Sequence, residues 1–470
     1  MPVPLIRPNP PRLSENSALL RSIEDSGIFS NFGPVNTALE QEIIDGLFAG
    51  QGSCMTVCNA TIGLMLAVQQ AIRVRPARRR YALMPSFTFA AAGHAAMWCG
   101  LTPLFCDINA DDWTACAAEE ERLLAQYGDD IAVIMPYATF GYDIDLARYE
   151  ALRTRFGVSV VVDAAASLGT MSADGRGFGT GFTGSIVFSM HATKSFAVGE
   201  AGVIYNGDAD AIRELRQMCN FGFGRPRTAT MAGLNGKLSE VGALIGRLRL
   251  ADYDQVVARR EELVASYRQA LPELTFQTKR PMRQAHQLAP VLLPEGLGPR
   301  RDEIAATMKD AGIGSATYFS PHLMQQDYFI EHAACGDLSV TDNIAGRIMS
   351  LPLFDTMTQH DVIEVTTVMQ HILEPMTRPM RQRRARYKVP ASPSYVPAGD
   401  LPSMLSLDIE LSLDIEVFQV SGNFVNSDYS IRPIADLDRS APDQGLPPLD
   451  DSLSRPELES QPMAASRTPV

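Results

Sequence analysis

The chain has 470 residues, of which 46% are apolar and 20% are charged. This length predicts roughly two or three domains with ample core, and the composition excludes collagen-like, mucin-like and wholly disordered chains. The net charge is −13, but residues 389–470 hold 13 acidic residues and 4 arginines, so −9 lies there and −4 lies in residues 1–388. A nearly neutral body gives no indication of nucleic-acid binding.

Membrane and metal binding find no support in the sequence. No run approaches the ~18 consecutive apolar residues of a membrane span, and the N-terminal residues lack the apolar core of a secretory signal. We therefore expect a cytoplasmic protein. The 7 cysteines are scattered without Cys-x-x-Cys pairing, so they predict neither a disulfide framework nor a metal site.

Short β-rich runs alternate with helical periodicity over residues 1–375, which predicts an α/β fold with a mainly parallel central sheet and crossover helices. Most of these runs are apolar throughout, as expected of strands covered on both faces. A helical pattern such as 145–157 lies between two of them. The predicted strands cover residues 81–85, 102–108, 130–137, 159–163, 185–190 and 202–206.

The character of the chain changes twice along its length. Residues 255–271 predict a charged amphipathic helix, and further helical patterns follow it, which suits a second, smaller α/β domain. A Pro-rich, Ser-rich and acidic stretch comes last and is predicted to be disordered. We expect a large domain with an N-terminal arm at 1–254, a small C-terminal domain at 255–376 and a disordered tail at 377–470. The further helices are predicted at 301–312 and 360–373.

Polar and aromatic residues directly follow four of the predicted strands. In open parallel sheets ligands bind beyond the carboxyl ends of the strands, so we expect these residues to share one cleft. Lys194 follows the fifth strand in a turn rich in small residues, where poor solvation would lower the pKa of its amine and free it for covalent chemistry with a carbonyl. Asp163 ends the fourth strand, where a buried carboxylate needs a cation such as a protonated pyridine nitrogen. For each residue alone, a surface lysine and a helix-capping aspartate are the alternatives.

A turn containing Asn59, Ala60 and Thr61 leads into a helical run. Such a turn offers backbone N–H groups and the positive end of the helix dipole to a phosphate, although ordinary capping by Asn59 or Thr61 is an equal alternative. Together with the lysine, the aspartate and an aromatic loop around Phe89, these are the parts that a pyridoxal phosphate site requires.

The order and spacing of these residues resemble the DegT/DnrJ/EryC1/StrS family of pyridoxal-phosphate-dependent sugar aminotransferases, over about residues 30–375. The resemblance implies the fold-type I, aspartate aminotransferase-like architecture. The matching signatures are Asn31-Phe-Gly-Pro34, Asn59-Ala-Thr61, Pro85-Ser-Phe-Thr-Phe89, Asp163-Ala-Ala165, Ser189 to Lys194, Gly199-Glu-Ala-Gly202, Gly233-Leu-Asn-Gly-Lys-Leu-Ser-Glu240, Arg259-Arg260, Tyr267 and Ser350-Leu-Pro352.

The resemblance implies catalytic roles for two residues. Lys194 would bond covalently to the cofactor and shuttle a proton, and Asp163 would face the pyridine nitrogen. Phe89 would stack on the ring. His322 is a candidate substrate contact by the resemblance, with a buried, hydrogen-bonded histidine as the alternative. His191, judged from its position beside Lys194, is a candidate substrate contact, with a structural role or a second acid/base role as the alternatives.

The resemblance also implies how the phosphate is held. Ala60, Thr61 and Ser189 would bind it, with Asn235 reaching it from the neighbouring subunit of a homodimer. Four alanines depart from the family pattern. The most consequential is Ala166, where the family usually has a glutamine that contacts the ring oxygen of the cofactor, so that contact is missing or is made by another group. The other three are Ala60, Ala138 and Ala201.

We therefore expect a homodimeric transaminase that moves an amino group from an amino acid to a nucleotide-linked keto-sugar, with L-glutamate as donor by resemblance and polysaccharide or glycosylated natural-product biosynthesis as its setting. One alternative is a non-catalytic scaffold member, which Ala166 and the tail favour and which Lys194 with Asp163 opposes. Another is a transaminase for a non-sugar ketone. The G-x-G-x-x-G pattern at 179–184 precedes a strand instead of opening a helix, so it does not indicate dinucleotide binding.

Overall fold

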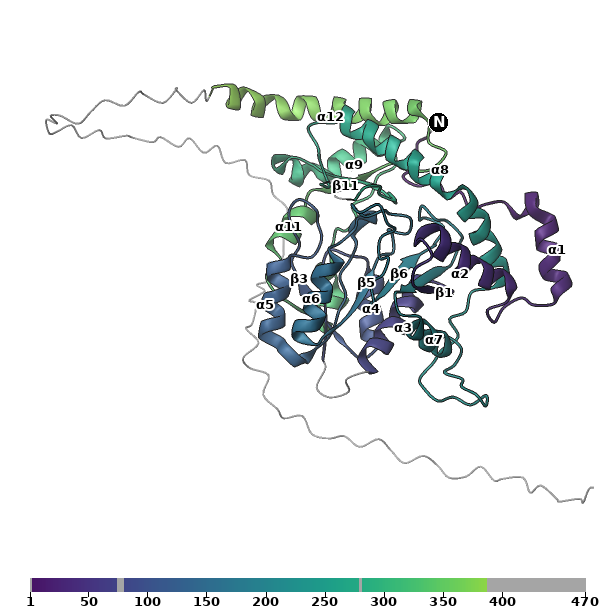
Figure 1. Cartoon of the computed structure of the whole chain (residues 1–470). Coiled ribbons are helices and arrows are strands. Elements are labelled where there is room, and N and C mark those ends of the chain that lie inside the picture. Colours follow the sequence, from purple (N-terminus) through teal and green to yellow (C-terminus); the bar gives the residue numbers. More distant parts are fainter. Residues whose placement is uncertain (1, 74–79, 279–280, 387–470) are drawn as a thin grey trace, which may run out of the picture. The chain divides into compact units, whose positions relative to one another are not determined.

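The computed structural model describes residues 2–73, 80–278 and 281–386 (Figure 1). Its central sheet has the strand order β1-β7-β6-β5-β4-β2-β3-β10. β7 is antiparallel to both of its neighbours, and the other neighbouring pairs are parallel. The expected α/β fold with a mainly parallel sheet is confirmed. The strands are β1 (Ser53–Val57), β2 (Tyr81–Pro85), β3 (Thr102–Cys106), β4 (Ile131–Ile134), β5 (Ser159–Asp163), β6 (Ser185–Ser189), β7 (Gly202–Asn206) and β10 (Ala334–Cys335).

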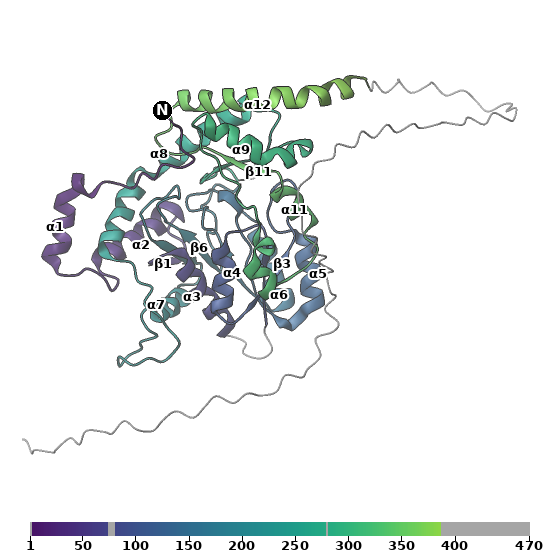
Figure 2. The ribbon, with the colours of Figure 1, turned by 180° about the vertical axis from the view of Figure 1, so that it is seen from behind.

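Helices cover both faces of this sheet (Figure 2). One apolar core contains residues of α2, α5, α6 and α8, and another contains residues of α3, α4, α7 and α10. The helices are α1 (Ser17–Ser26), α2 (Pro34–Leu47), α3 (Ala60–Arg73), α4 (Ala90–Trp98), α5 (Ala117–Tyr127), α6 (Leu146–Phe156), α7 (Ala209–Met218), α8 (Glu240–Ala270), α9 (Arg301–Asp310), α10 (Asp327–His332), α11 (Ser339–Ala345) and α12 (Gln359–Arg386).

The strands contribute alternate side chains to these two cores. In β5, Val160 and Val162 belong to the core on one face and Val161 to the core on the other. In β2, Leu83 belongs to the first of these cores and Met84 to the second. Successive side chains of a strand point to opposite faces, so a strand buried on both sides is expected to be apolar at most positions, which explains the continuous apolar runs in the sequence.

A second sheet of three antiparallel strands has the order β11-β9-β8. These strands are β8 (Thr275–Phe276), β9 (Ala289–Leu292) and β11 (Ile348–Leu351). A further apolar core joins them to α9, α12 and the C-terminal part of α8. The domain boundary expected at 254/255 falls inside α8, and the three-part division of the chain stays a prediction.

All six strands expected from the sequence are present, but the helix expected at 255–271 begins earlier, at Glu240. Ser239 starts it, because its Oγ accepts a hydrogen bond from the Gly242 amide at 3.1 Å. Glycines interrupt the apolar pattern of this first part. Gly246 allows close packing, since a Cβ there would lie 2.7 Å from Cδ2 of Leu39 in α2.

The expected disordered tail at 377–470 differs from the structure in its first residues. α12 continues through them to Arg386. The continuation has a physical reason, because methionine, arginine, glutamine and alanine favour helices and dominate residues 380–386. Residues 387–470 lie outside the described residues.

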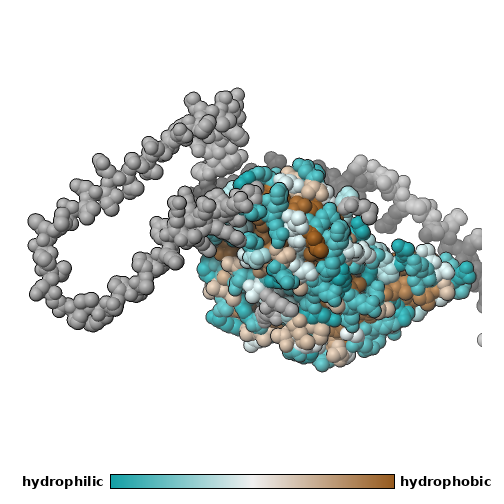
Figure 3. Space-filling view, turned by 90° about the horizontal axis from the view of Figure 1, so that it is seen from above, coloured by the Kyte–Doolittle hydropathy of each residue, from teal (hydrophilic) through white to brown (hydrophobic). Residues whose placement is uncertain are grey.

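Within the described ranges, no helix is both long enough and apolar enough to cross a membrane. Seen from above, the surface is mostly hydrophilic, with apolar residues in small groups (Figure 3). Among the described residues, no cluster of three or more histidine, cysteine, aspartate or glutamate side chains is suited to a metal.

We predict that Glu240→Gln lowers the free energy of unfolding by about 1–2 kcal/mol. The carboxylate is buried and accepts hydrogen bonds from the amides of Val35, at 2.7 Å, and Asn36, at 3.0 Å. These amides belong to the first turn of α2, so the glutamine would turn an NH₂ group toward one of them and remove a negative charge from a helix N-terminus. Urea denaturation followed by circular dichroism measures the change.

The matched control is Glu42→Gln, which also removes a carboxylate that joins α2 to α8. Glu42 pairs with Arg247, but the two side chains are 40% and 39% exposed. Exposed pairs contribute little, so a loss below about 0.5 kcal/mol is expected. Equal losses in the two variants would contradict the capping role of Glu240.

Candidate active site

A cavity of about 560 Å³ lies at the carboxyl ends of the central strands. Residues from β5, the β6–β7 connection, the start of α3 and the loop before α4 line it, together with segments far away in the sequence. The expected cleft is therefore present. Of the candidate site residues, the lining includes Ala60, Thr61, Phe89, Asp163, Ser189, His191 and Lys194.

Lys194 lies in a tight turn between β6 and β7. The turn is closed by hydrogen bonds from the Lys194 amide to the His191 carbonyl at 2.9 Å and from the Ala192 amide to the Gly199 carbonyl at 2.8 Å. The side chain reaches into the cavity, where Nζ donates a hydrogen bond to Oε1 of Gln287 at 2.8 Å. Burial lowers the pKa of the amine to about 8, although the charge of Asp163 opposes this. The amine is thus closer to losing its proton at neutral pH than an ordinary lysine.

Asp163 is the last residue of β5 and is almost completely buried. One carboxylate oxygen accepts a hydrogen bond from the Ala165 amide at 3.0 Å. Burial raises the pKa of the carboxyl group to about 6, which the Ala165 amide and the charge of Lys194 partly oppose. A buried carboxylate with a raised pKa is favourably placed to receive a cationic ligand group.

Tyr137 also lines the cavity. It is among the residues at the end of the third predicted strand that were expected to share the cleft, although the sequence assigned it no role of its own. Its backbone pairs with that of Asp163 across a parallel bridge. Burial, and then the charge of Asp163, raise the pKa of its hydroxyl well above the usual value. Tyr137 is therefore a neutral hydrogen-bonding group beside the carboxylate.

The start of α3 forms an amide-lined part of the cavity. The Asn59 side chain accepts a hydrogen bond from the Ile62 amide at 2.9 Å, whereas Ala60 and Thr61 come first in the helix and have no intrahelical acceptor for their N–H groups. Gly202 of β7 allows close packing here, since a Cβ would lie 2.9 Å from the Ala60 nitrogen. The capping alternative holds for Asn59, and the neighbouring amides remain suited to an anion.

Phe89 and His191 are two further candidate site residues in the lining. Phe89 precedes the first residue of α4 and is 58% exposed, as a side chain at a cavity opening would be. Nδ1 of His191 forms a hydrogen bond with the Thr193 hydroxyl at 2.8 Å, in a direction set by the histidine tautomer, and Nε2 lies 3.4 Å from Oε1 of Glu200. Both Thr193 and Glu200 line the cavity with it, so His191 remains a candidate substrate contact.

His322 does not line this cavity, although it was a candidate substrate contact. It is buried, with Nδ1 2.7 Å from the Ser86 hydroxyl and Nε2 2.8 Å from Asp342. The structure therefore agrees with the alternative interpretation of His322, a buried and hydrogen-bonded histidine. Asn235 is exposed and is also outside the lining.

Distant segments complete the cavity, and the sequence reasoning missed them. Ile6 comes from the N-terminal arm, Gln287 and Leu288 precede β9, and Tyr318 and Phe319 belong to the segment before His322. Tyr318 and Phe319 lie just before the candidate residue His322 in the sequence, which was the available signal. The sequence around Ile6, Gln287 and Leu288 did not indicate a ligand, because only the tertiary fold brings these residues to the strand ends.

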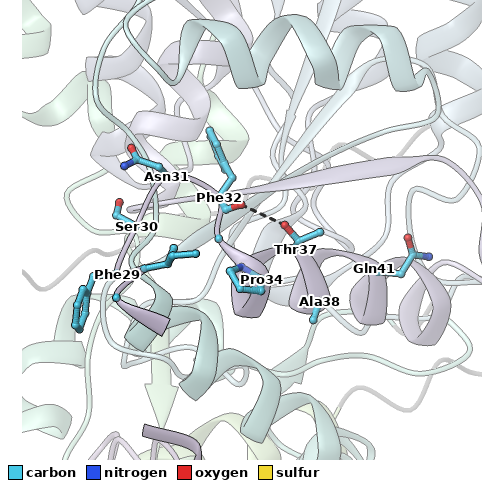
Figure 4. Close-up of a pocket in the computed structure, with 11 residues that line it drawn as sticks. Phe29, Ser30, Asn31, Phe32, Pro34, Thr37, Ala38 and Gln41 are labelled. Carbon is cyan, nitrogen blue, oxygen red and sulfur yellow. Dashed lines mark hydrogen bonds between the residues drawn. The ribbon is translucent and has the colours of Figure 1, made fainter. Parts of the chain in front are cut away.

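A second pocket of about 910 Å³ lies away from these groups, in the loop and first turns of α2 (Figure 4). It is lined by Gly27–Pro34, Thr37, Ala38 and Gln41, which include the Asn31-Phe-Gly-Pro34 signature. The Thr37 hydroxyl donates to the Phe32 carbonyl at 3.3 Å. No lysine, histidine or acidic residue is among the lining residues, so this pocket lacks the groups for the chemistry expected.

Comparison with known proteins gives a consistent result. The DegT/DnrJ/EryC1/StrS aminotransferase family matches residues 12–370. Protein Rv3402c of Mycobacterium tuberculosis is 31% identical over 375 residues, covering 78% of this chain and 89% of its own. A Bacillus cereus structure named provisionally as a PLP-dependent aminotransferase is 37% identical, with a TM-score of 0.74 and coverage of 78% and 99%. The structure of DesI with its TDP-sugar product is 27% identical, with a TM-score of 0.71 and coverage of 82% and 96%.

We predict that Asp163→Asn stabilises the cofactor-free protein by about 1–3 kcal/mol near pH 8 and has almost no effect near pH 4. The folded-state pKa of Asp163 is raised from 3.8 to about 6. Between these values the unfolded chain has released the proton that the folded chain keeps, so this carboxyl group lowers stability as the pH rises. Asparagine does not ionise and avoids that loss. Urea denaturation at the two pH values measures it.

The control for this variant is Asp129→Asn at an exposed position. It is expected to change stability by less than about 0.5 kcal/mol at both pH values. The same gain for Asp163→Asn near pH 4 and pH 8 would show that burial of the charge is not the cause.

Proposed function

Because the chain belongs to the DegT/DnrJ/EryC1/StrS aminotransferase family, we propose that it transfers an amino group from an amino acid to a nucleotide-linked keto-sugar. Family membership confirms the expected transaminase class and the pyridoxal phosphate cofactor. The donor, the acceptor and the roles of single residues belong to the proposal. The cavity that brings Lys194 and Asp163 together is the observation that carries it.

The residues around the cavity fit pyridoxal phosphate. The buried carboxylate of Asp163 has its pKa raised by burial, so a protonated pyridine nitrogen would be a favourable cationic partner for it. The first amides of α3 and the hydroxyl of Ser189 line the same cavity and suit a phosphate. Phe89, at the opening, is available to cover one face of a flat ring.

When bound, the cofactor supplies the electron sink that makes the Cα–H bond of an amino acid acidic. Asp163 would hold the ring nitrogen in its protonated form, because a neutralised pair is favoured over an isolated buried carboxylate. Lys194, with its pKa lowered to about 8 by burial, would be the general base that accepts the proton from Cα and the general acid that gives it up again.

The acceptor is proposed from the relatives. DesI was solved with a TDP-sugar product, and the cavity opening carries His191 and Glu200, which can hydrogen-bond to sugar hydroxyl groups. L-glutamate is proposed as donor by resemblance. The setting we propose is polysaccharide or glycosylated natural-product biosynthesis in the cytoplasm.

A homodimer is part of the proposal. Asn235 is exposed and does not line the cavity of its own chain, so it could reach a cofactor phosphate only in a second copy. The loop before α2 exposes two large apolar side chains, Ile28 at 44% and Phe29 at 53%. Burying these side chains against a second copy would favour association.

We predict that borohydride reduction of the pyridoxal-phosphate-loaded protein fixes the cofactor on Lys194. Peptide mapping by mass spectrometry identifies the labelled lysine, and Lys194→Ala should lose both the label and the visible absorbance. Lys309→Ala, at an exposed position in α9, is the matched control and should retain both. A label on any other lysine would refute the proposed site.

We predict further that glutamate removes the visible absorbance of the loaded protein and that a nucleotide-linked keto-sugar restores it. Mass analysis after incubation with glutamate and a panel of keto-sugars should show an amino-sugar nucleotide. Colour that responds to glutamate, without a product from any nucleotide sugar, would instead favour a non-sugar ketone as acceptor.

A further inference from the structure

Lys194 has one direct side-chain contact in the cavity that the proposed mechanism does not use. Its Nζ donates a hydrogen bond to Oε1 of Gln287 at 2.8 Å. Gln287 comes from the segment before β9, 93 residues later in the chain, and lines the wall together with Leu288. A polar side chain that meets the reactive amine from a different element is a candidate for controlling the amine.

The main chain that carries Gln287 is fixed by a buried arginine. Arg260 of α8 donates from Nη1 to the carbonyl oxygens of His286, at 3.1 Å, and Gln287, at 3.2 Å. The same guanidinium donates from Nε to Asp355 at 2.8 Å, and the arginine is only 3% exposed. A guanidinium held by a carboxylate has a defined direction, so both carbonyl groups are held in place.

The segment is also held from its other side. The amide of Ala285 donates to the hydroxyl of Thr170 at 3.1 Å, and that hydroxyl in turn donates to the Gly141 carbonyl at 2.7 Å. Gln287 therefore extends from a backbone anchored at two points. An anchored backbone limits the freedom of the glutamine side chain and makes its amide oxygen a fixed acceptor.

We propose that Gln287 is a positioning residue for transamination, whose amide oxygen holds the Lys194 amine against the cavity wall whenever that amine is not bonded to the cofactor. The inference rests on the proposed role of Lys194. A free lysine side chain has several rotatable bonds, and an acceptor on the facing wall selects the conformers that keep Nζ inside the cavity. The Arg260–Asp355 pair supports the position of that acceptor.

An amide suits this task because it carries no charge. The titratable groups that line the cavity with Lys194 are Asp163, Tyr137, His191, Glu200 and Tyr318. The amide oxygen accepts a hydrogen bond from the amine and a stronger one from the ammonium form. Gln287 therefore moderates the lowering of the Lys194 pKa by burial, without adding a second carboxylate that would keep the lysine protonated.

The test uses Gln287→Leu, which keeps the approximate volume and removes the acceptor, and Gln287→Glu, which adds a charge. In the cofactor-free full-length protein, the pH dependence of Lys194 acylation, followed by mass spectrometry, reports the pKa of its amine. The leucine variant should have a lower Lys194 pKa than the wild type, and the glutamate variant a higher one.

In the loaded enzyme, kcat of the leucine variant should fall about tenfold, with KM for glutamate changed by less than about threefold.

Gln284→Leu is the matched control from the same segment. Gln284 is buried and donates to the Phe140 carbonyl at 3.3 Å, but it does not line the cavity. Its loss should lower the melting temperature and leave the Lys194 pKa unchanged. If the leucine variant of Gln287 does not fold, Gln287→Asn, which is one methylene shorter, replaces it with the same expected direction.

Two results would overturn the inference. One is a Lys194 pKa that is the same in the wild type and in the Gln287 variants, and the other is a kcat within about twofold of the wild type for the folded leucine or asparagine variant. Failure of the proposed function is a separate result, because it places the borohydride label on another lysine, whereas acylation of the cofactor-free protein still reports whether Gln287 contacts Lys194.

Discussion

The site depends on the burial of two groups of opposite charge, Asp163 at the end of β5 and Lys194 in the turn after β6. Burial raises the pKa of the carboxyl group to about 6 and lowers that of the amine to about 8, and in both cases burial outweighs the attraction between the two charges. Without a ligand, these desolvated charges therefore cost stability. A bound group that offers a cation to one and a carbonyl to the other would relieve both costs, which links cofactor binding to the stability of the fold.

The sheet makes this arrangement possible. β5 and β6 are parallel neighbours, so their carboxyl ends lie side by side, and their continuous apolar runs are buried between two layers of helices. A charged residue is tolerated only where such a run ends. The same geometry brings the start of α3 to this edge, where its first amides face the cavity and are available for an anion.

The sequence was most informative where structure and chemistry are local. Asp163 and Lys194 each follow a recognisable strand, and the turn before α3 was visible as a cap, so this part of the cavity was predicted. Gln287 and Phe319 were not predicted as cavity residues, because strand periodicity carries no information about which distant segments meet. The start of α8 was not predicted for a different reason. Gly246 allows close helix packing and thereby interrupts the apolar pattern on which the prediction relied.

The departure at Ala166 also has a structural context. Its side chain is buried and does not line the cavity, so the alanine leaves no unpaired polar group behind. A different glutamine, Gln287, lines the cavity and contacts Lys194. The segment that carries Gln287 is held by Arg260 of α8 and Asp355, which follows β11. The environment of the reactive amine is thus set jointly by the strand ends of the central sheet and by the later part of the chain. Changes in that later part, remote from the strand ends, can therefore alter the chemistry of Lys194 without touching it.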